Sequence, residues 1–274
     1  MSLEQKAARL RSLHDEGSVL VLPNAWDAAS AVVIEEAGAQ AIATSSAGVA
    51  WTLGFPDGER LTRDVMLAAV ARIAAAVDVP VTADVEAGYG PDPGDVVATV
   101  RATLGAGAVG INLEDSSAPG VLHSAEAQSE RIRAARDAAA AGGVPSFVIN
   151  ARTDVFLREI GEPEARLGEV EARAEAYAAA GADCLFVPGL LDLATLQSLV
   201  ASAPLPISVM ARPGGPPIAA LAATGVRRIS VGPGISEAAY GLARRAAREL
   251  LETGTYESLD GAIAFPELQS LLRR

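Results

Sequence analysis

The sequence predicts an α/β chain folded as a (β/α)8 barrel of the TIM type, and three observations lead to this fold class. Short apolar segments alternate with helical segments rich in Ala, Arg and Glu, a pattern typical of parallel sheets. Eight such strand–helix units fit into the 274 residues of the chain, a normal length for an α/β barrel. A doubly wound open sheet is the alternative, but VLPNAWDAAS, which joins the first strand to the first helix, lacks the G-x-G-x-x-G fingerprint of dinucleotide-binding sheets.

Each expected strand is a short run of mainly apolar residues, and Gly or Pro commonly stands just before it. Glycine suits the left-handed residue that ends a helix, and the Val, Ile and Phe that follow suit a strand. In chain order the expected strands are Val19–Pro23, Ala41–Thr44, Val79–Asp84, Val109–Glu114, Phe147–Arg152, Cys184–Val187, Ile207–Met210 and Arg228–Val231. No linker or change in composition divides the chain. We therefore expect a single domain over residues 1–274, with residues 235–274 as additional C-terminal helices.

Charge and composition exclude several classes of partner. The net charge is −12, whereas a nucleic-acid-binding face is normally basic. No apolar run approaches the roughly 18 residues of a membrane span, and MSLEQKAARLRSLHDEGS has no apolar core like that of a secretory signal. The single cysteine, Cys184, excludes an internal disulfide and fits a reducing compartment. We therefore expect a cytoplasmic protein that binds neither nucleic acid nor membrane.

Lysine occurs only once, as Lys6 in the polar N-terminal segment. Enzymes that form a Schiff base with a substrate or with pyridoxal phosphate need an internal lysine, and a P-loop needs one after its glycines. The sequence therefore argues against all three mechanisms.

Acidic side chains are expected to meet at the carboxyl ends of the strands, where a barrel places its active site. Asp57 lies in the loop after the second strand, and Asp84 and Glu86 end the third. Glu114 ends the fourth strand, and Arg152 ends the fifth. Carboxylates packed together raise each other's pKa values, and a divalent cation relieves their repulsion. An oxygen-only ligand set favours Mg²⁺, with Mn²⁺ as an alternative, because zinc prefers His or Cys.

Five segments, taken together and in order, resemble the isocitrate lyase/phosphoenolpyruvate mutase superfamily. They are TSSAGVAWTLGFPDGE, VTADVEAGYG, GINLEDS, VINARTD and DCLFVPGL, and the resemblance runs roughly over residues 19–251. It implies a Mg²⁺-dependent enzyme that acts on α-oxo carboxylates, or on their C–C or C–P adducts, through an enolate. It also implies a homo-oligomer, a dimer or a tetramer, in which subunits exchange a C-terminal helix. The segment ISEAAYGLARRAARELLETG is consistent with that exchange.

The resemblance also implies roles for individual residues. Asp57, Asp84, Glu86 and Glu114 resemble the metal-binding shell, partly through water. Ser45, Ser46 and Ala47 resemble the segment that holds the substrate carboxylate through hydroxyl and backbone N–H groups. Arg152 resembles the arginine that contacts the oxo or enolate oxygen.

The loop after Glu114 departs from the superfamily pattern. Lyases of the superfamily carry a Lys-Lys/Arg-Cys-Gly-His loop here, whereas this chain has EDSSAPGVLHSAEAQ, without Lys or Cys. Mutases carry lysine and asparagine where this chain has Gly120 and Leu122. The chain therefore resembles a phosphonomutase-like branch that lacks the cysteine loop. His123 lies in this loop and is a candidate acid or base, although a solvated loop residue is the alternative.

The sequence leaves four functions open. The first is a Mg²⁺-dependent lyase, decarboxylase or hydrolase for a small α-oxo dicarboxylate. The second is a C–P mutase or hydrolase of the phosphonopyruvate or carboxyphosphonoenolpyruvate type. The third is a catalytically silent α-keto acid binding protein. The fourth is a sugar-phosphate enzyme, suggested by RPGGPP and VGPGIS after the last two strands.

Overall fold

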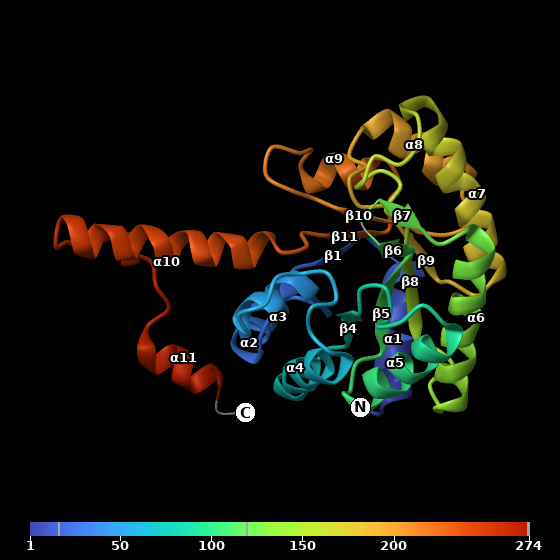
Figure 1. The fold of residues 1–274 in the computed structure, drawn as a ribbon. Coiled ribbons are helices and arrows are strands. Elements are labelled where there is room, and N and C mark those ends of the chain that lie inside the picture. The colour runs from blue at the N-terminus through green and yellow to red at the C-terminus, as the bar shows by residue number, and fades with distance from the viewer. Residues whose placement is uncertain (16, 119, 273–274) are drawn as a thin grey trace.

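Parallel strands form the centre of the molecule in the computed structural model, which describes residues 1–15, 17–118 and 120–272 (Figure 1). The 9-stranded sheet has the order β1–β11–β10–β9–β8–β5–β4–β3–β2. Its strands are β1 (Leu20–Leu22), β2 (Asn24–Ala25), β3 (Ile42–Thr44), β4 (Val81–Asp84), β5 (Gly110–Glu114), β8 (Val148–Arg152), β9 (Cys184–Phe186), β10 (Ile207–Met210) and β11 (Arg228–Ser230). The predicted barrel is confirmed, and every predicted strand segment contains an observed strand.

Pro23 separates β1, which lies within the first predicted strand, from β2, which follows the predicted strand and was not expected. On one side of the split β1 pairs with β11, and on the other side β2 pairs with β3. Proline has no N–H group to donate to a neighbouring strand, which explains why the ladder changes partner at this residue. The two edges of the sheet, β1 and β2, are therefore consecutive in the chain, and the sheet closes on itself.

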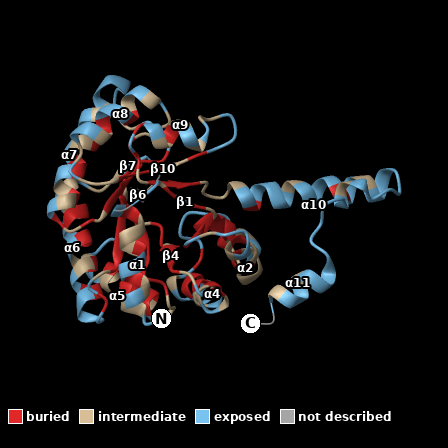
Figure 2. Cartoon of the chain, turned by 180° about the vertical axis from the view of Figure 1, so that it is seen from behind, coloured by how far each residue is buried: buried red, intermediate tan, exposed pale blue. Residues whose placement is uncertain are grey.

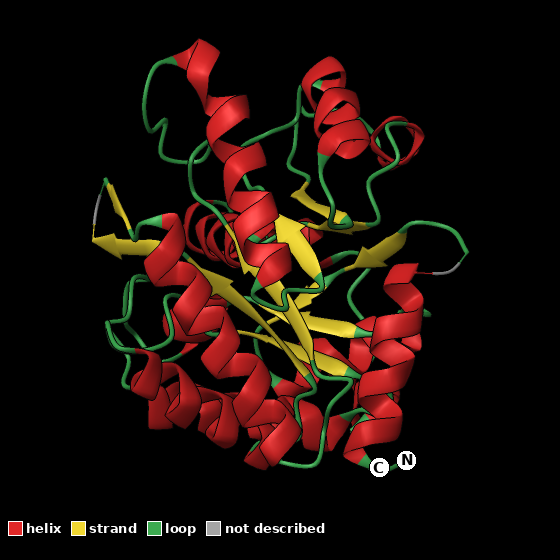
Figure 3. Ribbon diagram, turned by 90° about the vertical axis from the view of Figure 1, so that its right-hand side faces the viewer, coloured by secondary structure: helices red, strands yellow, loops and turns green. Residues whose placement is uncertain are grey.

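Helices lie outside the strands (Figure 3). They are α1 (Leu3–Asp15), α2 (Ala28–Glu36), α3 (Ser46–Thr52), α4 (Arg63–Ala76), α5 (Pro93–Gly105), α6 (Ala125–Ala141), α7 (Arg166–Ala179), α8 (Leu193–Ser202), α9 (Ile218–Ala223), α10 (Gly234–Glu252) and α11 (Phe265–Leu271), with 3-10 turns at Pro163–Ala165 and Glu257–Leu259. A hairpin of β6 (Ser116–Ala118) and β7 (Val121–Leu122) follows β5. Within the described residues, no helix is both long and apolar enough to cross a membrane.

Helix α10 extends away from the barrel instead of packing along it, and α11 follows it (Figures 1 and 2). Only Ser236 and Ala246 of α10 are buried. Near its start, Tyr240 contacts Trp51 of α3, with ring centroids 6.2 Å apart. The helix that follows the last strand of a (β/α)8 barrel normally belongs to the outer ring of helices. In this chain that helix projects outward.

The outer face of β1 is correspondingly open. Val21 is 40% exposed, while Leu20 and Leu22 on either side are 4% and 0% exposed. Val21 lines a surface groove of about 680 Å³ that runs between the end of α1 and the end of α2. A central residue of a barrel strand is normally covered by a helix, so the groove marks a place where such a cover is missing from the isolated chain.

Candidate active site

A small cavity lies at the carboxyl ends of the barrel strands. Its volume is about 140 Å³, below the roughly 300–1,000 Å³ of pockets for drug-sized ligands. Its lining comes from segments that are far apart in sequence: Asn24, Ser45, Ser46, Ala47, Asp57, Asp84, Asn112, Arg152, Leu157, Phe186, Pro188, Met210, Ser230, Gly232 and Pro233. The size and the polar lining suit a small organic acid.

Asp84 is held at the end of β4 by the segment that follows β3. The backbone N–H and the hydroxyl of Ser46 both donate to Asp84 Oδ2, at 3.2 and 3.0 Å. Ser45 caps α3 by accepting from the N–H of Gly48 at 3.2 Å. Asp84 Oδ1 is buried and has no hydrogen-bond partner among the described residues. Buried polar atoms normally have a partner, so this oxygen is available to a ligand or cation.

Glu86 reaches the loop that carries Asp57. Its Oε2 accepts from the backbone N–H groups of Gly58 and Glu59 at 3.0 and 2.6 Å. The residue has a left-handed φ of 51° and is 5% exposed, a conformation that is uncommon outside glycine. Burial and the neighbouring charges of Asp57 and Asp84 raise the pKa of Glu86 to about 8. Glu86 does not line the cavity, and its recorded contacts hold the Asp57 loop in place.

The turn after Glu86 is held in place by an arginine of α6. Arg131 on α6 is buried and donates to the carbonyl groups of Gly90 and Pro91 at 2.8 and 2.7 Å, and also to that of Ala87. Gly88 has a φ of 94°, and a Cβ there would lie 3.1 Å from a methyl group of Leu113. Glycine is therefore required at this position, and the turn stays close to β5.

Arg152 points into the cavity between two carboxylates. Its Nη1 lies 2.7 Å from Glu114 Oε2, and its Nε and Nη2 lie 2.6 and 3.1 Å from the two oxygens of Asp154. The guanidinium also stands 5.9 Å from the centre of the Phe186 ring. These carboxylates raise the pKa of Arg152, so it stays charged. Burial raises the pKa of Glu114, and the Arg152 charge opposes that rise.

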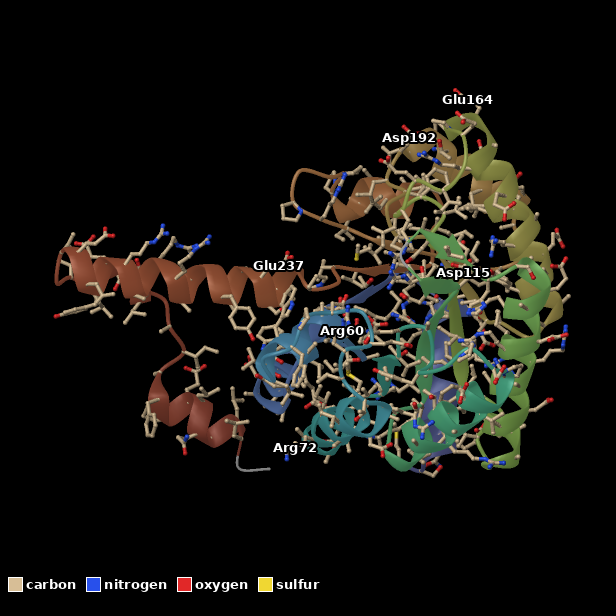
Figure 4. All side chains as sticks on the ribbon, in the orientation of Figure 1. Arg60, Arg72, Asp115, Glu164, Asp192 and Glu237 are labelled. Carbon is tan, nitrogen blue, oxygen red and sulfur yellow. The ribbon has the colours of Figure 1, made fainter. Side chains whose placement is uncertain are left out.

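Asp115, the residue after Glu114, serves a different purpose. Asp115, labelled in Figure 4, accepts from Arg173 Nη1 and from the hydroxyl of Tyr177, both at 2.9 Å, and it is fully buried. Its other oxygen accepts from the backbone N–H of Asp154 at 3.1 Å. Asp115 therefore ties the end of β5 to α7 and to the segment after β8, and it does not line the cavity.

His123 is not brought to the cavity. Its backbone N–H donates to the Asp115 carbonyl at 2.8 Å, and its own carbonyl accepts from Arg173 at 2.9 Å. Burial and nearby arginines lower the pKa of the ring. Of the other predicted residues, Ser45, Ser46, Ala47, Asp57, Asp84 and Arg152 line the cavity, whereas Glu86 and Glu114 stand behind it.

Asn112 and Phe186 also line the cavity, although motif comparison singles out neither. Asn112 lies two residues before Glu114 on β5, and side chains two apart on a strand point to the same side. That spacing was a usable signal for Asn112. Phe186 lies in DCLFVPGL, but as one apolar residue of an apolar strand it has no chemistry of its own that would assign it a role in a site.

The acidic side chains do not form a ready-made metal cage. Among the described residues, no group of three or more His, Cys, Asp or Glu side chains could together hold a metal ion. Mg²⁺ keeps several water ligands and commonly uses only one or two carboxylates. The unpartnered Oδ1 of Asp84, with Asp57 in the same cavity, fits that requirement.

Comparisons with a family model, with known sequences and with solved structures each find related proteins over most of the chain. A sequence model of the family described as phosphoenolpyruvate phosphomutase matches residues 10–251. The chain is similar to 2-methylisocitrate lyase of Escherichia coli (strain K12), at 32% identity over 216 residues, which are 76% of this chain and 70% of that protein. It is also similar to the crystal structure of a provisionally named phosphonomutase from Burkholderia cenocepacia J2315. That structure is 44% identical, has a TM-score of 0.83 and covers 93% of this chain and 100% of its own.

A further similar structure was solved with a small organic acid bound. It is that of oxaloacetate acetylhydrolase in complex with the product oxalate, with a TM-score of 0.86 and 27% identity. The match covers 98% of this chain and 94% of that one.

Proposed function

This chain belongs to the phosphoenolpyruvate phosphomutase family of the isocitrate lyase/phosphoenolpyruvate mutase superfamily, and from this premise we propose that it is a Mg²⁺-dependent enzyme for a small α-oxo carboxylate. We propose that it acts as a lyase, decarboxylase or hydrolase on an α-oxo dicarboxylate, an oxaloacetate-like compound, through an enolate. The observation that carries the proposal is the presence of Asp84, with one free carboxylate oxygen, and Arg152 in one cavity of about 140 Å³.

We assign the metal ion and the substrate carboxylate to different residues around this cavity. Asp84 and Asp57 would hold Mg²⁺, or Mn²⁺, with Glu86 and Glu114 acting through water. When bound, the ion would polarise the oxo oxygen of the substrate as a Lewis acid. Ser45, Ser46 and Ala47 line the same cavity as Asp84, so this segment would hold the substrate carboxylate beside that ion.

Arg152 supplies the electrostatic part of catalysis. When a bond on the carbon next to the oxo group breaks and the leaving fragment departs without the bonding electrons, that electron pair delocalises as an enolate and places negative charge on the oxo oxygen. Three of the five N–H donors of a guanidinium bind Glu114 and Asp154, which leaves two for the substrate. Because both carboxylates hold the guanidinium in place, little reorganisation accompanies the reaction, and a preorganised donor of this kind accelerates it.

A cysteine-dependent lyase mechanism does not suit this chain. The only cysteine, Cys184, is 0% exposed on β9, and burial raises its pKa to about 12. It does not line the cavity, so it cannot protonate a substrate there. The likeness to 2-methylisocitrate lyase therefore extends to the scaffold, while we propose a different substrate.

Phosphorus–carbon chemistry is the second candidate, because a provisionally named phosphonomutase is 44% identical to this chain. The loop after β5 argues against it, since Gly120 and Leu122 replace the lysine and asparagine of mutases. His123 would have to move from its present position to serve as the proton carrier in either reaction. A protein that binds α-keto acids without turnover is the third candidate.

We propose that α10 is exchanged between subunits of a homo-oligomer. The helix exposes Tyr240 and Leu242 at 44% and 40%, and the open groove at Val21 lies on the barrel face that a helix normally covers. A second copy of α10 seated there would cover Val21 and the exposed Tyr240 and Leu242 together.

The function is tested by incubating the purified protein with oxaloacetate, phosphonopyruvate and 2-methylisocitrate in the presence of Mg²⁺, with products followed by NMR. We expect turnover of the α-oxo dicarboxylate and its loss when EDTA is added. Turnover of phosphonopyruvate alone would favour the second candidate. Binding of pyruvate by calorimetry without any turnover would favour the third.

A further inference from the structure

The barrel interior below the cavity contains an arginine without an acidic partner. Arg228 on β11 is 1% exposed, and among the described residues no carboxylate forms an ion pair with it. Its recorded contacts are Asn112 Oδ1 at 3.1 Å and His14 Nε2 at 3.4 Å, and its Nε has no partner. Barrel interiors are usually filled by branched apolar side chains, and a buried unpaired charge is strongly unfavourable. The energetic cost of this buried charge therefore suggests that Arg228 has a function.

His14 does not neutralise the charge. Its Nδ1 lies 2.7 Å from the carbonyl oxygen of Leu10, and because a carbonyl oxygen only accepts, Nδ1 carries the proton. Nε2 is then the acceptor that faces Arg228. Burial and the Arg228 charge lower the pKa of His14 to about 3, so the ring is neutral near pH 7. The full positive charge remains beneath the cavity.

Arg228 fixes the orientation of the Asn112 amide. Two donors converge on Asn112 Oδ1: Arg228 Nη2 at 3.1 Å and Asn150 Nδ2 at 2.8 Å. A guanidinium has donors and no acceptor, so the Asn112 atom that faces it must be the amide oxygen. The NH₂ group of Asn112 is therefore turned away from Arg228, on the side of the cavity that Asn112 lines.

The position of Asn112 indicates which part of a ligand it would meet. Asn112 is the ladder partner of Asp84 on the neighbouring strand, and Asp84 carries the free carboxylate oxygen. A ligand held at Asp84 therefore presents its nearest oxygens to Asn112. Both donors to Asn112 Oδ1 polarise the amide, and Arg228 adds its charge, which strengthens the N–H groups as donors.

We propose that Asn112 is a substrate-binding residue whose amide donates to an anionic oxygen of the α-oxo carboxylate, and that Arg228 and Asn150 are positioning residues for that amide. This inference rests on the proposed function, because it assigns a further residue to the same site. It explains why an arginine without an acidic partner lies behind Asn112, beneath a cavity whose lining includes Asp57 and Asp84.

The test combines oxalate binding with thermal unfolding, because the two readouts move apart. Asn112→Asp has nearly the same shape, and its carboxylate would pair with Arg228. We expect an unchanged or higher Tm together with a Kd for oxalate, measured by calorimetry with Mg²⁺, that rises at least ~10-fold, as for a lost hydrogen bond to a charged group. Asn112→Leu removes the donor without adding charge, and we expect the same loss of binding with a lower Tm.

Arg228→Met tests positioning separately. Removing a buried unpaired charge should leave Tm unchanged or raise it. Without Arg228 the Asn112 amide is less well oriented, so its hydrogen bond to oxalate should weaken and the Kd for oxalate should rise about 3- to 10-fold. The double variant Asn112→Leu/Arg228→Met should bind oxalate as weakly as Asn112→Leu alone, since Arg228 acts through Asn112. If Arg228 has only a structural role, Arg228→Met should instead lower Tm and leave the Kd for oxalate unchanged.

The outcomes separate this inference from the proposed function. If the wild-type protein binds oxalate with Mg²⁺ and Asn112→Asp binds it within twofold of wild type, the role of Asn112 is overturned and the proposed function stands. If the wild-type protein neither binds oxalate nor turns over any α-oxo acid, the proposed function fails and the assignment of Asn112 fails with it.

Discussion

The guanidinium of Arg152 lies 2.7 Å from the carboxylate of Glu114, and both side chains are nearly buried. Asp154 holds the other edge of the same guanidinium. One arginine thus stands between two carboxylates, and this cluster positions the only charged donor that lines the cavity within the described residues. Changes at Arg152 therefore affect both the reaction and the stability of the barrel.

Arg152→Ala should abolish turnover and also destabilise the protein, because it leaves Glu114 and Asp154 buried without their partner, at a cost of about 3–5 kcal/mol. Arg152→Lys separates the two effects. It keeps the charge and most of the stability, but it loses the forked geometry, so kcat should fall about 10²- to 10³-fold. Steady-state kinetics and thermal unfolding of both variants check this. A lysine variant with wild-type kcat would contradict the role of Arg152.

The stability of the protein without Mg²⁺ should fall as pH rises from about 6.5 to about 8, because below pH 6.5 the titration of His14 opposes the effect of Glu86. Glu86 has a pKa of about 8 when folded, against 4.5 for the ordinary side chain. In this window the folded state binds more protons than the unfolded state, so the free energy of unfolding decreases with pH. Chemical denaturation at several pH values measures the slope. Glu86→Gln should flatten it while keeping an acceptor for Gly58 and Glu59.

Mg²⁺ binding should release protons near pH 7. Burial and the neighbouring acids raise the pKa values of Asp57 and Glu86, and a cation favours their ionised forms. Calorimetric titrations in buffers of different ionisation enthalpy count the protons released. A heat that is independent of the buffer would contradict the coupling, and Asp84→Asn should weaken Mg²⁺ binding itself.

At acid pH a different residue should limit stability. His14 has a folded pKa of about 3, against 6.5 for the ordinary side chain. The unfolded state therefore binds more protons between these values, and stability present above pH 6.5 is lost as pH falls, by up to about 1.4 kcal/mol per pH unit. His14→Gln, which cannot be protonated, should show a shallower loss between pH 6.5 and pH 4 in denaturation experiments.

Exchange of α10 predicts matched effects at both ends of the contact. Leu242→Glu on the helix and Val21→Glu in the groove should each reduce the mass found by multi-angle light scattering. Arg72→Glu, on the exposed side of α4, changes charge elsewhere on the surface (Figure 4) and should leave the mass unchanged. A wild-type protein that is monomeric at micromolar concentration would contradict the exchange.

The barrel and much of its site could be predicted because local sequence determines them. Strand ends are marked by Gly or Pro, so Asp84 and Arg152 could be placed at the correct ends of their strands. Glu86 could not be placed as well, because its contact with Gly58 and Glu59 depends on a left-handed backbone conformation. The pairing of His14 with Arg228 joins residues 214 positions apart, and no local pattern encodes it.

The local sequence also could not predict that α10 projects away from the barrel. An amphipathic helix has the same sequence pattern whether its apolar face packs on its own barrel or on another one. His123 shows the same limit at a smaller scale. Its loop position made it a candidate, whereas the hydrogen bonds of its backbone to Asp115 and Arg173 keep it outside the cavity.

The outward course of α10 also has a consequence for how the protein is made. With exchange, completing the barrel becomes a second-order event, so a dilute, newly synthesised chain waits with the Val21 groove uncovered until it meets another. Mass action then makes Tm rise with protein concentration. For the same reason, the half-time of refolding should decrease as the protein concentration increases.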